Sequence, residues 1–221
     1  MEYPKAIYHY TSVEKLFLIL GNFQLKMNAL KNVNDPREKM EIIPVVDIKA
    51  KNAYKGLQLL HKRNISSNTI TCFSGDSEKT KGYDLPTMWA HYGDNYKGVS
   101  IKICTPIFIE ENNKFLYFDK VRYEKPKAKI TVEGEMSLVV LRQLMFFSKR
   151  PDWDSEQEWR VLSLRSQRMC NIQKSLKAII LGLDFDLAFL PSIKKLITGT
   201  NITIQQLKLD NDTQSFYVEP A

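Results

Sequence analysis

Glycine and cysteine are both scarce in this chain, and their scarcity excludes several common kinds of site. Only 9 of the 221 residues are glycine, and none of the glycine-rich motifs that hold nucleotide phosphates is present. The cysteines lie at 72, 104 and 170, spacings of 32 and 66 that fit no zinc-binding pattern. The HExxH and GxSxG motifs are also missing. These absences exclude the usual ATPase, Rossmann, zinc-protease and hydrolase classes at the level of motifs, and we expect no metal.

A long apolar run is also lacking. The longest falls far short of the ~20 residues that span a membrane, and Met1 to Pro4 has no basic region leading into an apolar stretch. An odd number of widely spaced cysteines indicates core thiols in a reducing compartment. We therefore expect a cytoplasmic protein with no signal peptide and no membrane contact.

Charge is plentiful but not clustered. The formal net charge is +7, and hydrophobic residues make up 43% of the chain, as in ordinary globular proteins. The positive balance either keeps a soluble surface away from neutrality or indicates an anionic partner, such as nucleic acid or a dinucleotide. Only short basic clusters occur, such as Lys125 to Lys129, so a nucleic-acid-binding tail or a nuclease is not indicated. Length and composition predict one domain over residues 1–221.

Hydrophobic periodicity and turn residues predict strands and helices in mixed order. Strands are predicted at Lys5–Tyr10, Phe23–Asn28, Asn68–Ser74, Gly98–Cys104, Lys114–Arg122, Glu156–Leu164, Ala178–Leu183, Ile202–Leu209 and Phe216–Val218. Helices are predicted at Val13–Leu20, from Asn34-Asp35-Pro36 onward, and at Asn52–Lys62, Thr87–Tyr92, Glu135–Lys149 and Phe185–Thr198, with a break at Pro191. Gly75–Leu85 is predicted to be a mobile loop. Because strands follow strands in the middle of the chain, the fold class is α+β rather than a doubly wound sheet.

Three short segments combine residue types that can carry chemistry. Tyr8 to Thr11 (YHYT) sets a histidine at the end of the first strand, where its ring can donate to a sugar hydroxyl or be partnered in the core. Trp89 and Tyr92 lie three apart on a predicted helix, so they can form a wall for a flat ring or pack inside. Asn34 to Glu38 (NDPRE) is a helix-opening turn that needs no further role.

The richest segment is Trp153 to Arg160 (WDSEQEWR). If it is a strand, Glu156, Glu158 and Arg160 share one face, because side chains alternate along a strand. Two carboxylates and a guanidinium on one face form either a solvated ladder or part of a cleft that uses them. Trp159 points to the other face, and we expect it to be buried.

Taken in order, these motifs resemble a bacterial family described as domain of unknown function 2971. Its members carry YHYT, NDPxE, CFS, MWxHYG followed by GV, and WxxExEWR. The matching segments here are Tyr8–Thr11, Asn34–Glu38, Cys72–Ser74, Met88–Gly93 with Gly98-Val99, and Trp153–Arg160. The resemblance spans about residues 7–183.

The order of a histidine, an aromatic residue and a glutamate is similar to that of the His-Tyr-Glu class of ADP-ribosyltransferases. This resemblance implies a split β-sheet core with flanking helices, and NAD as substrate without a metal. It implies that His9 contacts the NAD ribose and that Tyr92 stacks on nicotinamide. Glu158 would hold a ribose hydroxyl and stabilise the oxocarbenium-like state as nicotinamide leaves. The stretch before Tyr92 is longer than in that pattern, so Tyr83 or Trp89 is an alternative stacking residue.

The Glu156-x-Glu158 pair is also similar to the paired glutamates of arginine-directed transferases, in which the second glutamate binds ribose. The residues expected to bind NAD are His9, Tyr10, Thr11, Asn34, Asp35, Ser74, Trp89, Tyr92 and Arg160. The resemblance implies a toxin or anti-phage effector that modifies a protein or nucleic acid, with an antitoxin or defence-system protein as a candidate partner. A NAD glycohydrolase, and a non-catalytic nucleotide-binding module on a degenerate transferase fold, stay open as alternatives.

Overall fold

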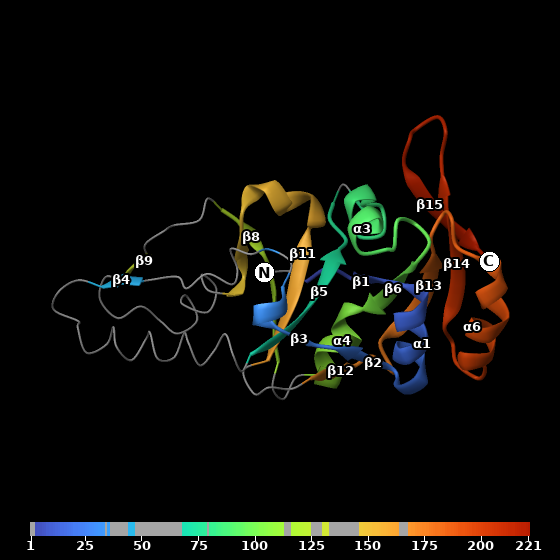
Figure 1. Ribbon diagram of the computed structural model, residues 1–221, viewed down its shortest axis with the longest axis horizontal. Coiled ribbons are helices and arrows are strands. Elements are labelled where there is room, and N and C mark those ends of the chain that lie inside the picture. Colours follow the sequence, from blue (N-terminus) through green and yellow to red (C-terminus); the bar gives the residue numbers. More distant parts are fainter. Residues whose placement is uncertain are drawn as a thin grey trace.

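The computed structural model describes residues 3–33, 35, 44–46, 68–78, 80–112, 116–124, 130–132, 146–163 and 168–221. Its centre is a nine-stranded mixed sheet, and the chain is α+β as the order of elements predicts (Figure 1). In spatial order the strands are β15 (Phe216–Pro220), β14 (Thr203–Leu209), β13 (Leu176–Leu181), β6 (Val99–Cys104), β1 (Ala6–Thr11), β5 (Thr69–Gly75), β11 (Glu158–Ser163) and β7 (Leu116–Lys120), with β3 (Asn28–Ala29) also paired to β5.

Shorter elements surround this sheet. The two-stranded pairs are β2 (Gln24–Lys26) with β12 (Met169–Asn171), β8 (Arg122–Tyr123) with β10 (Ser148–Lys149), and β4 (Pro44–Val46) with β9 (Ile130–Val132). The α-helices are α1 (Val13–Asn22), α3 (Pro86–His91), α4 (Thr105–Asn112) and α6 (Leu190–Leu196). The 3₁₀ segments are η1 (Leu30–Asn32), η4 (Pro151–Glu156) and η5 (Leu187–Phe189).

The two faces of the sheet carry separate cores. Ile7 of β1 joins a core with apolar residues of α1, α4 and α6, whereas Tyr8 and Tyr10 join a second core with residues of α3. This division follows from the alternation of side chains along a strand. Figure 1 shows α1 and α4 on one side of the sheet and α3 on the other. Both faces are therefore covered, which a central strand needs if it is apolar on both sides.

A gap interrupts the sheet between β1 and β5. The two strands pair at only two positions, Ile7 with Gly75 and Tyr8 with Ser74, while β1 stays paired with β6 along its whole length. β11 occupies the other edge of β5, and β3 returns to the first edge only at the start of β5. Among the described residues, Thr71–Phe73 therefore have no strand partner on that edge.

Several elements differ from those predicted. The strand predicted at 23–28 begins one residue later, because Phe23 takes a left-handed conformation (φ 53°) as the C-cap of α1. It is also broken at Met27, so that β2 and β3 join different sheets. The helix predicted at 135–149 is wrong at its end, where Ser148–Lys149 pair with β8; its part at 135–145 lies outside the described residues, as does the helix predicted at 52–62. Pro191 lies in the first turn of α6 rather than breaking a longer helix, a position that tolerates proline.

The turn between α3 and β6 has an uncommon backbone. Asp94–Tyr96 have positive φ angles of 52°, 50° and 66°, and aspartate and asparagine tolerate this region because their short side chains can bond locally. Tyr96 then packs parallel to Trp89, with ring centroids 6.1 Å apart. The turn thereby fixes α3, whose C-terminal cap is Tyr92.

Candidate functional site

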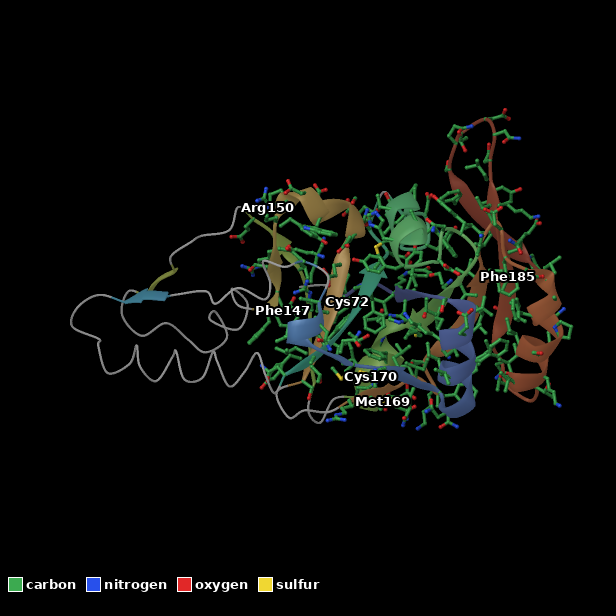
Figure 2. The ribbon with its side chains drawn as sticks, in the orientation of Figure 1. Cys72, Phe147, Arg150, Met169, Cys170 and Phe185 are labelled. Carbon is green, nitrogen blue, oxygen red and sulfur yellow. The ribbon has the colours of Figure 1, made fainter. Side chains whose placement is uncertain are left out.

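A pocket of about 170 Å³ lies at the gap between β1 and β5. Its walls come from both strands, from the segment around η1, from α3, and from the continuous segment β10-η4-β11. Figure 2 shows Cys72 on β5, and it labels Phe147 and Arg150 on the segment that leads into η4. The lining residues are His9, Tyr10, Asn28, Asn32, Val33, Asp35, Ile70, Thr71, Cys72, Phe73, Met88, Tyr92, Lys149, Glu156, Glu158 and Arg160.

Glu158, the first residue of β11, is held by two cations. Arg160 follows two positions later on the same face, and its Nε and Nη2 lie 2.6 and 3.0 Å from the two carboxylate oxygens. Lys149 Nζ lies 3.4 Å from Glu158 Oε2. Burial opposes ionisation, but these cations outweigh it and lower the pKa of Glu158 from 4.5 to about 2. The side chain is therefore a fixed carboxylate at neutral pH.

Glu156 reaches the same cluster from a different element. It ends η4, and Gln157 then turns with φ 46° before β11 begins. The prediction that Glu156 shares a strand face with Glu158 and Arg160 is therefore wrong. A 3₁₀ turn and a left-handed residue replace the first part of the predicted strand, yet they bring the carboxylate back to its neighbours.

Both carboxylate oxygens of Glu156 are bonded. Oε2 accepts a hydrogen bond from Lys149 Nζ at 2.6 Å, and Oε1 accepts one from the Tyr92 hydroxyl at 2.9 Å. The backbone carbonyl of Glu156 accepts from Ser74 Oγ at 2.9 Å. Ser74 was expected to bind NAD, but it is fully buried and does not line the pocket. Its hydroxyl instead fixes the end of η4.

The charges of this cluster balance. Glu156, Glu158, Lys149 and Arg160 each expose 8% or less of their surface, and buried charges of this kind are tolerated when they are paired. Arg160 Nη1 also donates to the carbonyl of Phe146 at 2.9 Å. Sequence reasoning missed Lys149. Two carboxylates and one guanidinium required a further cation, but nothing local to residue 149 indicated which lysine supplies it.

His9 lies across the gap, with Nδ1 3.0 Å from the carbonyl oxygen of Cys72. A carbonyl only accepts, so Nδ1 carries the hydrogen. Burial lowers the pKa of His9, which leaves the ring neutral near pH 7 with Nε2 as an acceptor. The ring can therefore accept from a sugar hydroxyl rather than donate to one.

The rings of His9 and Phe73 are 5.7 Å apart between centroids, on the sheet face that also carries Trp159. By alternation, His9 and Glu158 leave their strands toward opposite faces. Both nevertheless line the pocket, because the sheet is interrupted between β1 and β5.

Of the three aromatic residues considered for stacking, Tyr92 lines the pocket. Trp89 is fully buried, and its Nε1 donates to the carbonyl of Tyr83 at 2.8 Å. The Trp89 ring meets Tyr10 edge to face, and the Tyr83 ring meets Tyr8 in the same way. Trp89 and Tyr83 therefore belong to the core under α3.

The remaining expected residues divide in the same manner. Tyr10 lines the pocket, but its hydroxyl donates to the carbonyl of Gly82 at 2.7 Å, which anchors the loop that was expected to be mobile. Thr11 is buried in the pairing with β6 and does not reach the pocket. Asp35 is buried and lines the pocket, whereas Asn34 lies outside the described residues.

Two further features bear on the kind of site. Among the residues with described positions, no group of three or more His, Cys, Asp or Glu side chains could hold a metal ion. None of the helices in the described ranges has the length and apolar character needed to cross a membrane.

No curated protein and no solved structure matches the chain. One family match covers residues 88–161, about a third of the 221 residues and less than the motifs suggested. The matched segment contains Met88 and Tyr92 on one wall of the pocket and all four charged residues of the cluster on the other. This segment is therefore similar to the family described as protein of unknown function (DUF2971).

Proposed function

We propose that this protein is an ADP-ribosyltransferase that breaks the bond between nicotinamide and ribose of NAD in the pocket between β1 and β5. The observation that carries the proposal is the meeting of His9, Tyr92 and Glu158 at one pocket. These residues come from distant segments, and their order along the chain is the order in the His-Tyr-Glu class.

Glu158 has the properties that this chemistry needs. Breaking the N-glycosidic bond builds positive charge on the ribose, and a carboxylate already fixed in place stabilises that charge without reorganising. A carboxylate offers about four acceptor positions. Arg160 and Lys149 donate three hydrogen bonds to Glu158, and the Cys72 thiol takes the fourth position. A ribose hydroxyl would bind this carboxylate by displacing the thiol, which is a weak donor. Nicotinamide leaves as a neutral molecule, so no general acid is needed.

The other walls suit the same end of NAD. The neutral His9 ring has Nε2 as an acceptor for a ribose hydroxyl. Tyr92 and Met88 together offer an aromatic and a thioether surface for a flat ring. The volume of about 170 Å³ is below the roughly 300–1,000 Å³ of pockets that enclose whole drug-sized ligands. We therefore place only the nicotinamide and its ribose in the pocket, with the adenosine half outside.

The acceptor is proposed to be a protein or a nucleic acid, as for a toxin or an anti-phage effector. The net charge of +7 favours an anionic acceptor. If water takes the place of the acceptor, the same pocket acts as a NAD glycohydrolase.

A non-catalytic nucleotide-binding module is the second candidate, and the balance of the buried charges favours it. Each glutamate is paired with an internal cation, which weakens the field available to stabilise a ribosyl cation. In that case NAD or a related nucleotide would bind without losing nicotinamide.

The deciding experiment measures nicotinamide release from NAD and NAD affinity for the wild type, Glu158→Gln and Glu219→Gln. Glu219→Gln is the matched control, because Glu219 is about half exposed on β15 and its carboxylate lies 3.3 Å from Lys208 Nζ. We expect Glu158→Gln to lose about 10²–10³ in rate with a much smaller change in NAD affinity, and Glu219→Gln to resemble the wild type. Assays run with cell lysate and with water alone separate transferase from glycohydrolase.

The outcomes separate the candidates. Binding of NAD without release by the wild type favours the binding module. A wild type that neither binds NAD nor releases nicotinamide, with or without lysate, refutes both candidate functions. All assays are run well below the temperature at which Glu158→Gln unfolds, so that a loss of activity reflects the chemistry and not the loss of the fold.

A further inference from the structure

We propose that Lys149 is a positioning residue that acts through Glu156 to hold the Tyr92 phenol at the wall of the pocket. The inference concerns three side chains from three separate elements. It rests on the proposed function only where NAD is used as a probe.

Lys149 is buried at the end of β10, beside β8. Lysine is almost never fully buried unless it is paired, and here its Nζ lies 2.6 Å from Glu156 Oε2, the distance of a strong charge-assisted hydrogen bond. The same ammonium lies 3.4 Å from Glu158 Oε2 and 4.3 Å from the centre of the Trp153 ring. The ring and the two carboxylates hold the ammonium in one place.

Glu156 passes this constraint on. With Oε2 on Lys149, its other oxygen faces the Tyr92 hydroxyl, which donates to it at 2.9 Å. The hydrogen bond from Ser74 fixes the Glu156 backbone, so the carboxylate is held from both ends. Tyr92 lies at the last turn of α3, where its ring is half-buried. The hydroxyl bond therefore fixes the outer end of a ring whose other end is set by the helix.

The relay also links the two walls of the pocket. Lys149 touches both glutamates, so a change in its position alters the partner of Tyr92 and one partner of Glu158 together. A salt bridge with only a structural role would change stability when broken. If the relay exists, the effect of substituting Lys149 depends on whether Tyr92 is present, and the reverse also holds. This dependence should disappear when Glu156 no longer connects the two side chains.

The first test is a mutant cycle on the unfolding equilibrium constant at neutral pH. Lys149→Met and Tyr92→Phe are made singly and together, in the wild type and in Glu156→Gln. In the wild type, we expect the effect of the double substitution on the unfolding equilibrium constant to differ about tenfold from the product of the single effects. In Glu156→Gln, we expect the two effects to be additive in free energy. If Lys149→Met alone does not fold, Lys149→Gln, which also removes the charge, replaces it in the cycle. Additivity in the wild type, or equal coupling without Glu156, would overturn the relay.

The second test is NAD binding, measured with Lys149→Met, Lys149→Arg, Tyr92→Phe and the surface control Lys208→Met. We expect Lys149→Met and Tyr92→Phe each to weaken NAD binding about tenfold, their combination to add little, and Lys149→Arg and Lys208→Met to stay within about threefold of the wild type. If the double variant loses NAD affinity by the product of the two single losses, the two residues act independently and the relay is refuted. A wild type that binds no NAD refutes the proposed function, and the stability cycle then decides the relay alone.

Discussion

Replacing Glu158 by glutamine should destabilise the fold by about 3 kcal/mol, although the two side chains have nearly the same shape. Two routes give this magnitude. A carboxyl whose pKa falls from 4.5 to about 2 on folding contributes about 3 kcal/mol at neutral pH. Removing one partner of a buried ion pair costs about 3–5 kcal/mol, because the remaining charge stays buried without compensation. In Glu158→Gln, Arg160 would lose its carboxylate partner, and the cluster would carry a net positive charge.

The assay is urea unfolding at neutral pH for Glu158→Gln, Glu219→Gln and the double variant Glu158→Gln/Lys149→Met. Glu219→Gln breaks only a half-exposed pair with Lys208 and should cost less than about 1 kcal/mol. The double variant restores the balance of charge and should regain at least about 1 kcal/mol relative to Glu158→Gln. A cost for Glu158→Gln no greater than that of Glu219→Gln would refute the reasoning that the cluster is a buried, balanced network.

Stability should fall in two stages on acidification. The first begins as the pH drops below 6.5, the ordinary pKa of a histidine, because burial lowers the pKa of His9, and the second lies between pH 4.5 and about 2, as Glu158 protonates. Unfolding midpoints measured across this range should lose the second stage in Glu158→Gln, and identical curves for the two proteins would contradict the assignment. Trp159→Ala should cost about 3–5 kcal/mol in urea unfolding, because Trp159 is 5% exposed and stacks on Phe118; a fully stable variant would contradict its place in the core. Gly182→Ala should destabilise the chain by at least about 1–3 kcal/mol, because a Cβ there meets the backbone carbonyl of Tyr96, whereas Gly21→Ala, which meets no atom, should be neutral or stabilising in thermal unfolding.

The central strands were predictable because their signal is local. β1, β5 and β6 alternate or run apolar between turn residues, and they form within a residue or two of the predicted positions. Alternation along β11 also predicted that Trp159 is buried, and this is confirmed by its 5% exposure.

What the sequence did not reveal depends on contacts between distant segments. Residues 153–160 alternate well enough to predict a strand through Glu156, but the 3₁₀ turn and the left-handed Gln157 are imposed by tertiary bonds such as the one from Ser74. Lys149 gave no signal because its partners lie on another element. The gap beside β5 has no local pattern either, since β1 keeps its β6 partner while it leaves β5.

The position of β1 in the middle of the sheet affects how the protein folds during its synthesis. Its partners β5 and β6 lie at 69–75 and 99–104, and β11 with its charged cluster begins only at Glu158. During synthesis β1 therefore has no partner strand, and its apolar side chains stay exposed, until the segments that form β5 and β6 have left the ribosome. Pairing over such sequence separations is slow and exposes a chain to aggregation. A nascent or truncated chain that ends before β11 would have neither Glu158 nor Arg160, so the pocket can gain its full set of walls only late in folding.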